Sequence, residues 1–161
     1  MEADGMRKRL SVAWILILAV TAAIAADRPP SSPPPGFIEA PAELIHWQPL
    51  PSFEGGQVVV LIGKPGEAGP LVVRVKLPPN IQVPAHTHPD SRTYTVLEGE
   101  WKLGFGAKYE ASALRSYRAG SVYRLPANSA HFQATGPKGA TVQIESIGPT
   151  KTDFIEAPQK Q

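Results

Sequence analysis

The stretch that decides the fold is VPAHTHPDSRTYTVLEG, residues 83–99. Its extended sequence places His86 and His88 two residues apart, so a β-strand would present both imidazoles on one face. A third histidine, His131, follows a turn signal at residues 125–130, LPANSA. Three imidazoles from two strands are a common way for a β-protein to hold a divalent transition metal. This stretch therefore predicts both a sheet and a metal site.

Outward from this stretch, short apolar runs alternate with turn signals. Residues 57–62, 71–77 and 141–147 read as strands, and residues 98–99 read as a tight turn between two further strands. Eighteen prolines and fourteen glycines favour turns over long helices, and only residues 108–116 have helical character, as one or two turns or as a loop. The pattern predicts one all-β domain, an antiparallel sandwich or barrel. A jelly-roll β-barrel would enclose a cavity that suits three histidines.

The N-terminus has the pattern of a secretory signal. Basic residues 7–9 precede an apolar run that ends in a small-x-small motif. An uncleaved anchor is the alternative, but the run is shorter than the ~20 residues of a spanning helix. We expect a periplasmic or secreted protein with no membrane contact after cleavage. The sequence divides into a signal peptide (1–25), a proline-rich linker (26–43), a barrel (44–150) and a loosely packed polar tail (151–161).

Charge and composition exclude several classes of function. The chain carries 16 Lys and Arg against 14 Asp and Glu, a net charge of +2, which falls to about +1 without the predicted signal. This leaves no basic stripe for a nucleic acid. The absence of cysteine excludes disulfides, thiolate metal sites and cysteine nucleophiles.

These residues resemble the cupin superfamily, in particular small single-domain bacterial cupins, over about residues 45–150. The resemblance rests on two motifs: Val83 to His88 with Arg92 and Gly99, and then Gly120, Pro126, Asn128 and His131. It implies a cupin jelly-roll barrel in which His86, His88 and His131 bind one divalent transition metal, whether Zn, Fe, Mn, Ni or Cu. Cupins often pair through sheet edges, so the resemblance also implies a homodimer.

Arg92 departs from the cupin pattern, because it stands where the family has a metal-binding glutamate. A guanidinium has no lone pair and cannot ligate. A divalent ion with three neutral imidazoles and Arg92 would form a positive pocket, which favours a small-molecule carboxylate held by the metal and the guanidinium. Asp90 could compensate the charge, but we expect its turn to point it outward. The alternative is a relic pocket without metal, in which Arg92 fills the vacated volume and hydrogen-bonds to its neighbours.

Three further residues are candidates for substrate binding. Tyr94 has the strand parity of Arg92, Gln133 has that of His131, and Tyr123 belongs to a neighbouring strand. Each could equally be a hydrogen-bonded core residue. Phe105 is expected in the core and His46 at the surface.

Two functions fit these predictions. The first is an exported cupin that acts as a metal-dependent oxidoreductase of the dioxygenase type on a small anionic substrate. The second is a non-enzymatic protein that binds or senses a small molecule or metal. An enzyme needs acid or base groups beside the metal, whereas a binding protein needs only a fitted cavity.

Overall fold

The structure is a computed structural model that describes residues 32–157. The predicted signal peptide (1–25), the first part of the predicted linker and the last four residues lie outside this range. From Gly36 onward, the described residues form one compact unit. No helix within the described range is long and apolar enough to cross a membrane.

The described residues are almost entirely strands, which confirms the all-β prediction. Two single turns of 3-10 helix are the exceptions, η1 (Ala42–Leu44) and η2 (Ala111–Ala113), and η2 lies in the stretch expected to have helical character. The strands are β1 (Gln48–Pro49), β2 (Gln57–Ile62), β3 (Gly69–Leu77), β4 (Gln82–Thr87), β5 (Arg92–Phe105), β6 (Arg115–Arg118), β7 (Val122–Leu125), β8 (His131–Gly148) and β9 (Asp153–Phe154).

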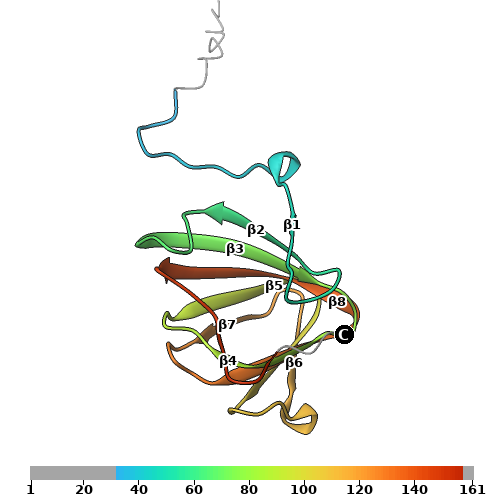
Figure 1. Cartoon of the computed structure of the whole chain (residues 1–161). Helices are drawn as coiled ribbons and strands as arrows, with labels where there is room; N and C mark the ends of the chain where they lie inside the picture. Colours follow the sequence, from blue (N-terminus) through green and yellow to red (C-terminus); the bar gives the residue numbers. More distant parts are fainter. Residues whose placement is uncertain (1–31, 158–161) are drawn as a thin grey trace, which may run out of the picture. The chain divides into compact units, whose positions relative to one another are not determined.

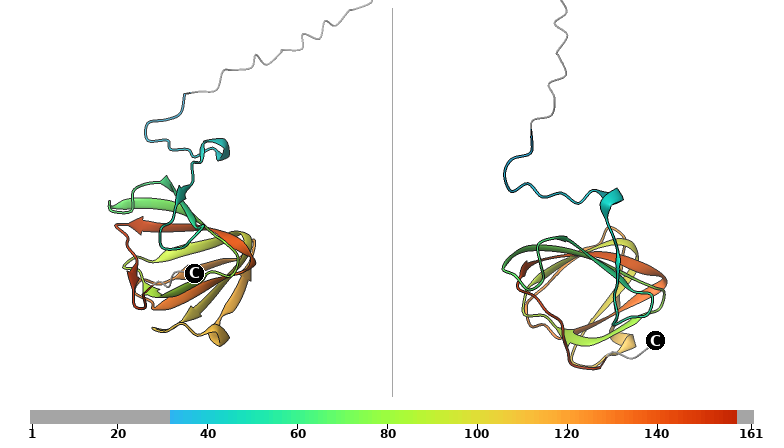
Figure 2. Two further views of the ribbon diagram at one scale, coloured as in Figure 1. Left: turned by 45° about the vertical axis from the view of Figure 1, so that its right-hand side comes forward. Right: turned by 45° about the horizontal axis from the view of Figure 1, so that its top comes forward.

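Strand β8 is the centre of a single antiparallel sheet (Figure 1). Its C-terminal half pairs with β3, its N-terminal half pairs with β4, and β5 pairs with it along nearly its whole length. The path of paired strands is β1-β2-β3-β8-β4-β9, and β5 also pairs with β6 and β7. The sheet curls so that its strands surround a common interior (Figure 2), as in a jelly-roll barrel.

The predicted turn at residues 98–99 is wrong, because β5 runs through it without a break. The pairing of β5 with β8 shifts between Val96 and Glu98, which marks a bulge in β5, and again between Gly99 and Trp101, where the extra residues belong to β8. Gly99 has φ +72°, and a Cβ there would lie 2.0 Å from the carbonyl oxygen of Gly139. A bulge with a glycine bends a strand sharply without ending it, and this lets one long strand follow the curl of the barrel.

Register places the inward-facing residues in rungs that run from β5 through β8 to β3. These rungs are Arg92–Ser146–Leu71, Tyr94–Ile144–Val73 and Val96–Val142–Val75. The last rung joins the apolar core at one end of the barrel, whose buried residues are Leu77, Ile81, Val83, Val96, Trp101, Ala140 and Val142. The first two rungs line the same cavity as two of the histidines and add the polar side chains of Arg92, Tyr94 and Ser146, so polar groups enter the interior at this end of the barrel.

Phe105 does not join this core, contrary to expectation. It is the last residue of β5 and is 63% exposed. The neighbouring Phe132 is 1% exposed and packs so closely that a Cβ on Gly104 would lie 2.2 Å from its ring. At this end of β5 the buried aromatic ring is therefore Phe132 rather than Phe105.

The segment after Pro149 is hydrogen-bonded to the barrel, which the prediction of a loosely packed tail did not include, although the side chains of residues 151–155 are exposed as expected. Strand β9 pairs with the histidine strand β4, with Phe154 opposite His86. The backbone N–H of Ile155 then donates to the carbonyl of Ala85 over 2.8 Å. The end of the chain thus covers the exposed edge of β4.

Candidate metal site and ligand cavity

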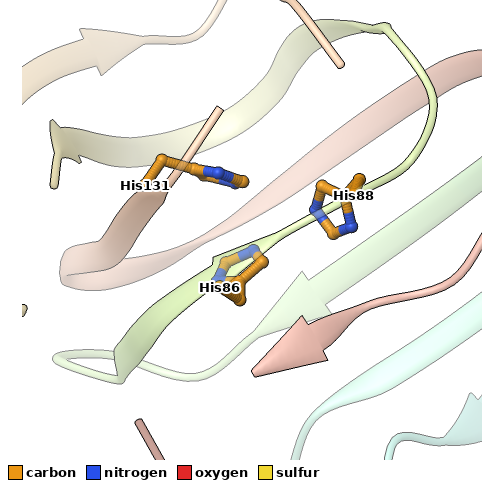
Figure 3. A group of neighbouring side chains, drawn as sticks. All are labelled: His86, His88 and His131. Carbon is orange, nitrogen blue, oxygen red and sulfur yellow. The ribbon is translucent and has the colours of Figure 1, made fainter. Parts of the chain in front are cut away.

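The three histidines meet inside the barrel (Figure 3). His86 lies on β4, His88 follows the end of that strand, and His131 begins β8 directly opposite His86. Their candidate ligand nitrogens all lie within 4.8 Å of one another, and all three residues are buried. The period of two along β4 and the pairing of β4 with β8 are sufficient to bring the three rings together, as predicted.

Backbone carbonyls orient all three rings. The Nδ1 atom of His86 lies 2.7 Å from the carbonyl oxygen of Pro84, that of His131 lies 2.9 Å from Ser129, and that of His88 lies 2.9 Å from Lys151. A carbonyl only accepts, so each Nδ1 carries the proton and each Nε2 keeps its lone pair. Carbonyl partners of this kind are typical of metal-binding histidines, because they fix the ring and its tautomer.

His131 provides the clearest test of whether the site fits a metal ion. Its side chain is 0% exposed, and its Nε2 has no hydrogen-bond partner among the described residues. An unpaired lone pair in the interior is costly unless something binds it. A neutral imidazole facing two others is a suitable donor set for a divalent transition metal, and the residues therefore fit the ion that the cupin pattern implies.

The pKa values keep the three imidazoles neutral. Burial, reinforced by the nearby His131, lowers the pKa of His86 from 6.5 to about 4. Burial and the charge of Arg92 lower the pKa of His88 from 6.5 to about 3. Burial also lowers the pKa of His131. At neutral pH no imidazole proton therefore has to be displaced from Nε2.

Asp90 points into the protein and pairs with Arg92, so the expectation that it points outward is wrong. The Nε of Arg92 donates to Asp90 Oδ2 over 2.9 Å, and the two side chains are only 9% and 6% exposed. The hydroxyl of Thr150 also donates to this carboxylate. Burial alone would raise the pKa of Asp90, but the hydrogen bonds from Arg92 and Thr150 outweigh it and lower the pKa. The carboxylate thus neutralises the guanidinium within the site.

Arg92 uses its remaining donors on other neighbours. Its Nη2 donates to Thr150 Oγ1 and, over 3.2 Å, to the carbonyl of Lys151. Its Nη1 lies 3.1 Å from Nε2 of His88, which is the lone-pair nitrogen of that ring. Arg92 therefore bonds to its neighbours, as the alternative of a relic pocket without metal predicts.

A cavity of about 310 Å³ lies beside the histidines. This volume is at the small end of the range of about 300–1,000 Å³ typical of ligand pockets. Its polar lining comes mainly from β4, β5, β8 and the C-terminal segment, and most of its apolar lining from β3 and the loop after β1, which also contributes one serine. The polar residues are Ser52, His86, His88, Arg92, Tyr94, Gln133, Ser146, Thr150, Lys151 and Thr152, and the apolar residues include Leu50, Phe53, Leu71, Val73, Val75 and Ile144.

Two of the three further candidates line this cavity. These are Tyr94 and Gln133. Tyr123 lies behind Tyr94, with the two rings stacked 4.9 Å apart, and its hydroxyl accepts a hydrogen bond from Trp101 over 3.1 Å. Burial raises the pKa of Tyr94. Gln133 lies beside both phenols, yet its Nε2 has no partner of hydrogen-bond geometry among the described residues. The cavity therefore contains a protonated phenol and an unused amide donor.

The C-terminal segment contributes functional residues that sequence reasoning missed. Thr150, Lys151, Thr152 and Phe154 line the cavity, and the Phe154 ring lies 5.6 Å from the ring of His86. Glu156 accepts hydrogen bonds from the backbone N–H groups of Ala85 and Tyr109. The polar sequence of this segment has no motif, and only its pairing with β4 reveals its role.

A curled antiparallel sheet that surrounds a histidine cluster and a cavity defines the cupin type of β-barrel. The family model described as "ChrR Cupin-like domain" matches residues 40–146. The chain therefore belongs to this cupin family. No curated protein matches the chain.

Solved structures share the fold. The structure of KdgF from Halomonas sp. has a TM-score of 0.53 at 18% identity, and covers 69% of this chain and 93% of its own. The polyketide cyclase RemF from Streptomyces resistomycificus has a TM-score of 0.53 at 20% identity, covering 64% and 75%. The DMSP lyase DddQ from Ruegeria pomeroyi has a TM-score of 0.55 at 19% identity, covering 74% and 64%. At such identities these likenesses establish the fold and leave the reaction open.

Proposed function

We propose that this protein binds one divalent transition metal through the Nε2 atoms of His86, His88 and His131, and uses it to capture a small molecule in the adjacent cavity. The observation that carries this proposal is the shared tautomer: three buried, neutral rings hold their Nδ1 atoms on backbone carbonyls and direct their lone pairs inward. Zinc, iron, manganese, nickel and copper are all compatible with imidazole ligands. Three protein ligands leave coordination positions for water or a ligand.

Charge balance supports a carboxylate as the preferred head group. Asp90 neutralises Arg92, and the three imidazoles are neutral, so the charge of a bound dication would remain uncompensated by the cavity walls. An anionic oxygen ligand removes that imbalance, and a buried dication with neutral ligands attracts it strongly. Gln133, which lines the same cavity as His86 and His88, adds an unpaired amide donor for such a ligand.

The cavity favours binding over acid–base catalysis. Among the described residues that line it, none is an aspartate or glutamate, and the ionisable groups besides the histidines are Arg92, Tyr94 and Lys151. Tyr94, with its raised pKa, is a proton donor for hydrogen bonds rather than a base. A binding or sensing protein needs no further group.

Oxidoreductase chemistry of the dioxygenase type is the second candidate. Three protein ligands would leave coordination positions free on a bound metal, and this favours the second candidate. A redox metal would supply the reactivity toward O₂, while the protein would position the substrate. In that case Tyr94 and Gln133 would orient the substrate beside the metal site. Oxygen consumption by the iron-loaded protein, in the presence of a bound ligand, separates the two candidates.

We also propose that the protein is exported to the periplasm or secreted, and that it forms a homodimer. The basic residues followed by an apolar run within residues 1–25 support export. Cupins often pair through sheet edges, which supports the dimer. Cell fractionation with N-terminal sequencing, and light scattering on the purified mature chain, test the two points.

A cobalt(II) titration of untagged protein tests the metal proposal. Visible absorption of cobalt in a histidine site should saturate at about one ion per chain, and zinc should displace it. Absorption that never exceeds that of cobalt in buffer would refute the site.

A further inference from the structure

The walls of the cavity differ in polarity from one side to the other. In the rung of Arg92 and in the rung of Tyr94, the β5 residue is polar, whereas the β3 residues of the same rungs, on the other side of β8, are Leu71 and Val73. Val75 continues the apolar side toward the core. A ligand that fits both sides must itself have one polar end and one apolar end.

The two sides of the cavity also differ in charge. On the polar side, the Arg92–Asp90 pair cancels internally, and a metal on the histidines would contribute net positive charge. On the β3 side, the described lining residues Leu71, Val73 and Val75 offer no partner for a charge. A second charged group on the ligand would be buried there without compensation, which is strongly unfavourable.

We propose that the cavity selects a monocarboxylate with an apolar tail, whose carboxylate lies at the histidine side and whose tail packs against Leu71, Val73 and Val75 of β3. The inference rests on the proposed function, because the metal provides the charge that holds the carboxylate. Gln133, 3% exposed and with its Nε2 unpaired among the described residues, is the protein donor for a carboxylate oxygen.

Chain length is the first test. Calorimetry on the zinc-loaded full chain should show affinity rising from acetate to butanoate to hexanoate by about fourfold per buried methylene until the tail fills the cavity. Equal affinity across the series would overturn the proposal. The zinc titration of the same sample reports on the metal site, so loss of metal binding refutes the proposed function, whereas a flat series with normal metal binding refutes only this inference.

Charge at the tail is the second test. Hexanedioate has the same chain length as hexanoate but places a second carboxylate against β3, so it should bind at least tenfold more weakly. Hexan-1-ol keeps the tail without the anionic head and should also bind weakly. Hexanedioate binding as tightly as hexanoate would contradict the apolar site for the tail.

A matched pair of variants places the tail. Val73 lines the cavity, whereas its neighbour Val72 is not among the lining residues and is directed to the other face of β3 by strand alternation. Val73→Phe should abolish the gain from acetate to hexanoate while zinc binding persists, and Val72→Phe should leave both unchanged. The same gain in both variants would show that the tail does not reach β3.

Discussion

The guanidinium of Arg92 hydrogen-bonds to the lone pair of His88, with Nη1 of Arg92 3.1 Å from Nε2 of His88. Because the carbonyl of Lys151 holds Nδ1 of the same ring, Nε2 is the atom that His88 would offer to a metal. A metal ion and Arg92 therefore compete for one nitrogen. The arginine at the position of the usual cupin glutamate has two effects. It removes a potential metal ligand, and it occupies Nε2 of His88, a ligand that remains.

Removing this competitor should strengthen metal binding. In the double variant Arg92→Gln/Asp90→Asn, the freed imidazole and the loss of a nearby positive charge should tighten zinc binding by about tenfold, with no unpaired carboxylate left behind. Competition with a chromophoric chelator measures the change. Arg74→Gln is the matched control, because Arg74 bonds to Gln143 away from the histidines. Weaker zinc binding in the double variant would show that Arg92 supports the site.

The Asp90–Arg92 pair should contribute substantially to stability. Asp90→Asn leaves a buried guanidinium without its counter-charge, so we expect the free energy of unfolding to fall by about 3 kcal/mol. Urea denaturation measures this. The control is Glu67→Gln, which removes the partner of Lys64 in a pair whose side chains are 64% and 72% exposed and should cost under ~1 kcal/mol. Similar losses in both variants would mean that the buried pair has no special role.

Periodicity made much of the fold and the histidine cluster predictable. The spacing of His86 and His88, and their separation from His131 by turn signals, depend only on strand geometry. Bulges were harder to predict, because Gly99 resembles a turn residue and only its contact with Gly139 shows that β5 continues.

The missing parts of the site depend on contacts between distant segments. Asp90 turns inward because Thr150, 60 residues later, donates to its carboxylate beside Arg92. The carbonyl that orients His88 belongs to Lys151, 63 residues away. No local pattern encodes these contacts, and a short polar segment near a chain end is usually loosely packed.

Deleting residues 149–161 should impair the metal site. The deletion removes the carbonyl that fixes His88 and the strand that covers β4, and loss of such an outer partner typically weakens metal binding by about 10- to 100-fold. Deletion of residues 158–161 alone keeps every described contact and is the control. Zinc affinity, measured with the same chelator, should fall only in the longer deletion, and wild-type affinity there would exclude a role for the segment.

Acid should destabilise the metal-free protein. The pKa values of about 4 for His86 and about 3 for His88 lie below the ordinary 6.5, so the unfolded chain binds more protons than the folded one in this interval. The contribution of the neutral histidines to the free energy of unfolding should therefore be fully present above pH 6.5. It should decrease as the pH falls toward 4. Urea denaturation at several pH values above 5, where carboxylates contribute little, measures the slope of the free energy of unfolding against pH. His86→Gln should reduce the slope and the exposed His46→Gln should not; an identical slope in both would contradict the assignment.

The most direct test of the central claim is the metal content of protein purified without an affinity tag. Elemental analysis should find about one divalent transition metal per chain in the wild type and in His46→Ala, and a small fraction of that in His131→Ala. A wild type without metal, or a His131→Ala variant with as much metal as the wild type, would contradict the three-histidine site.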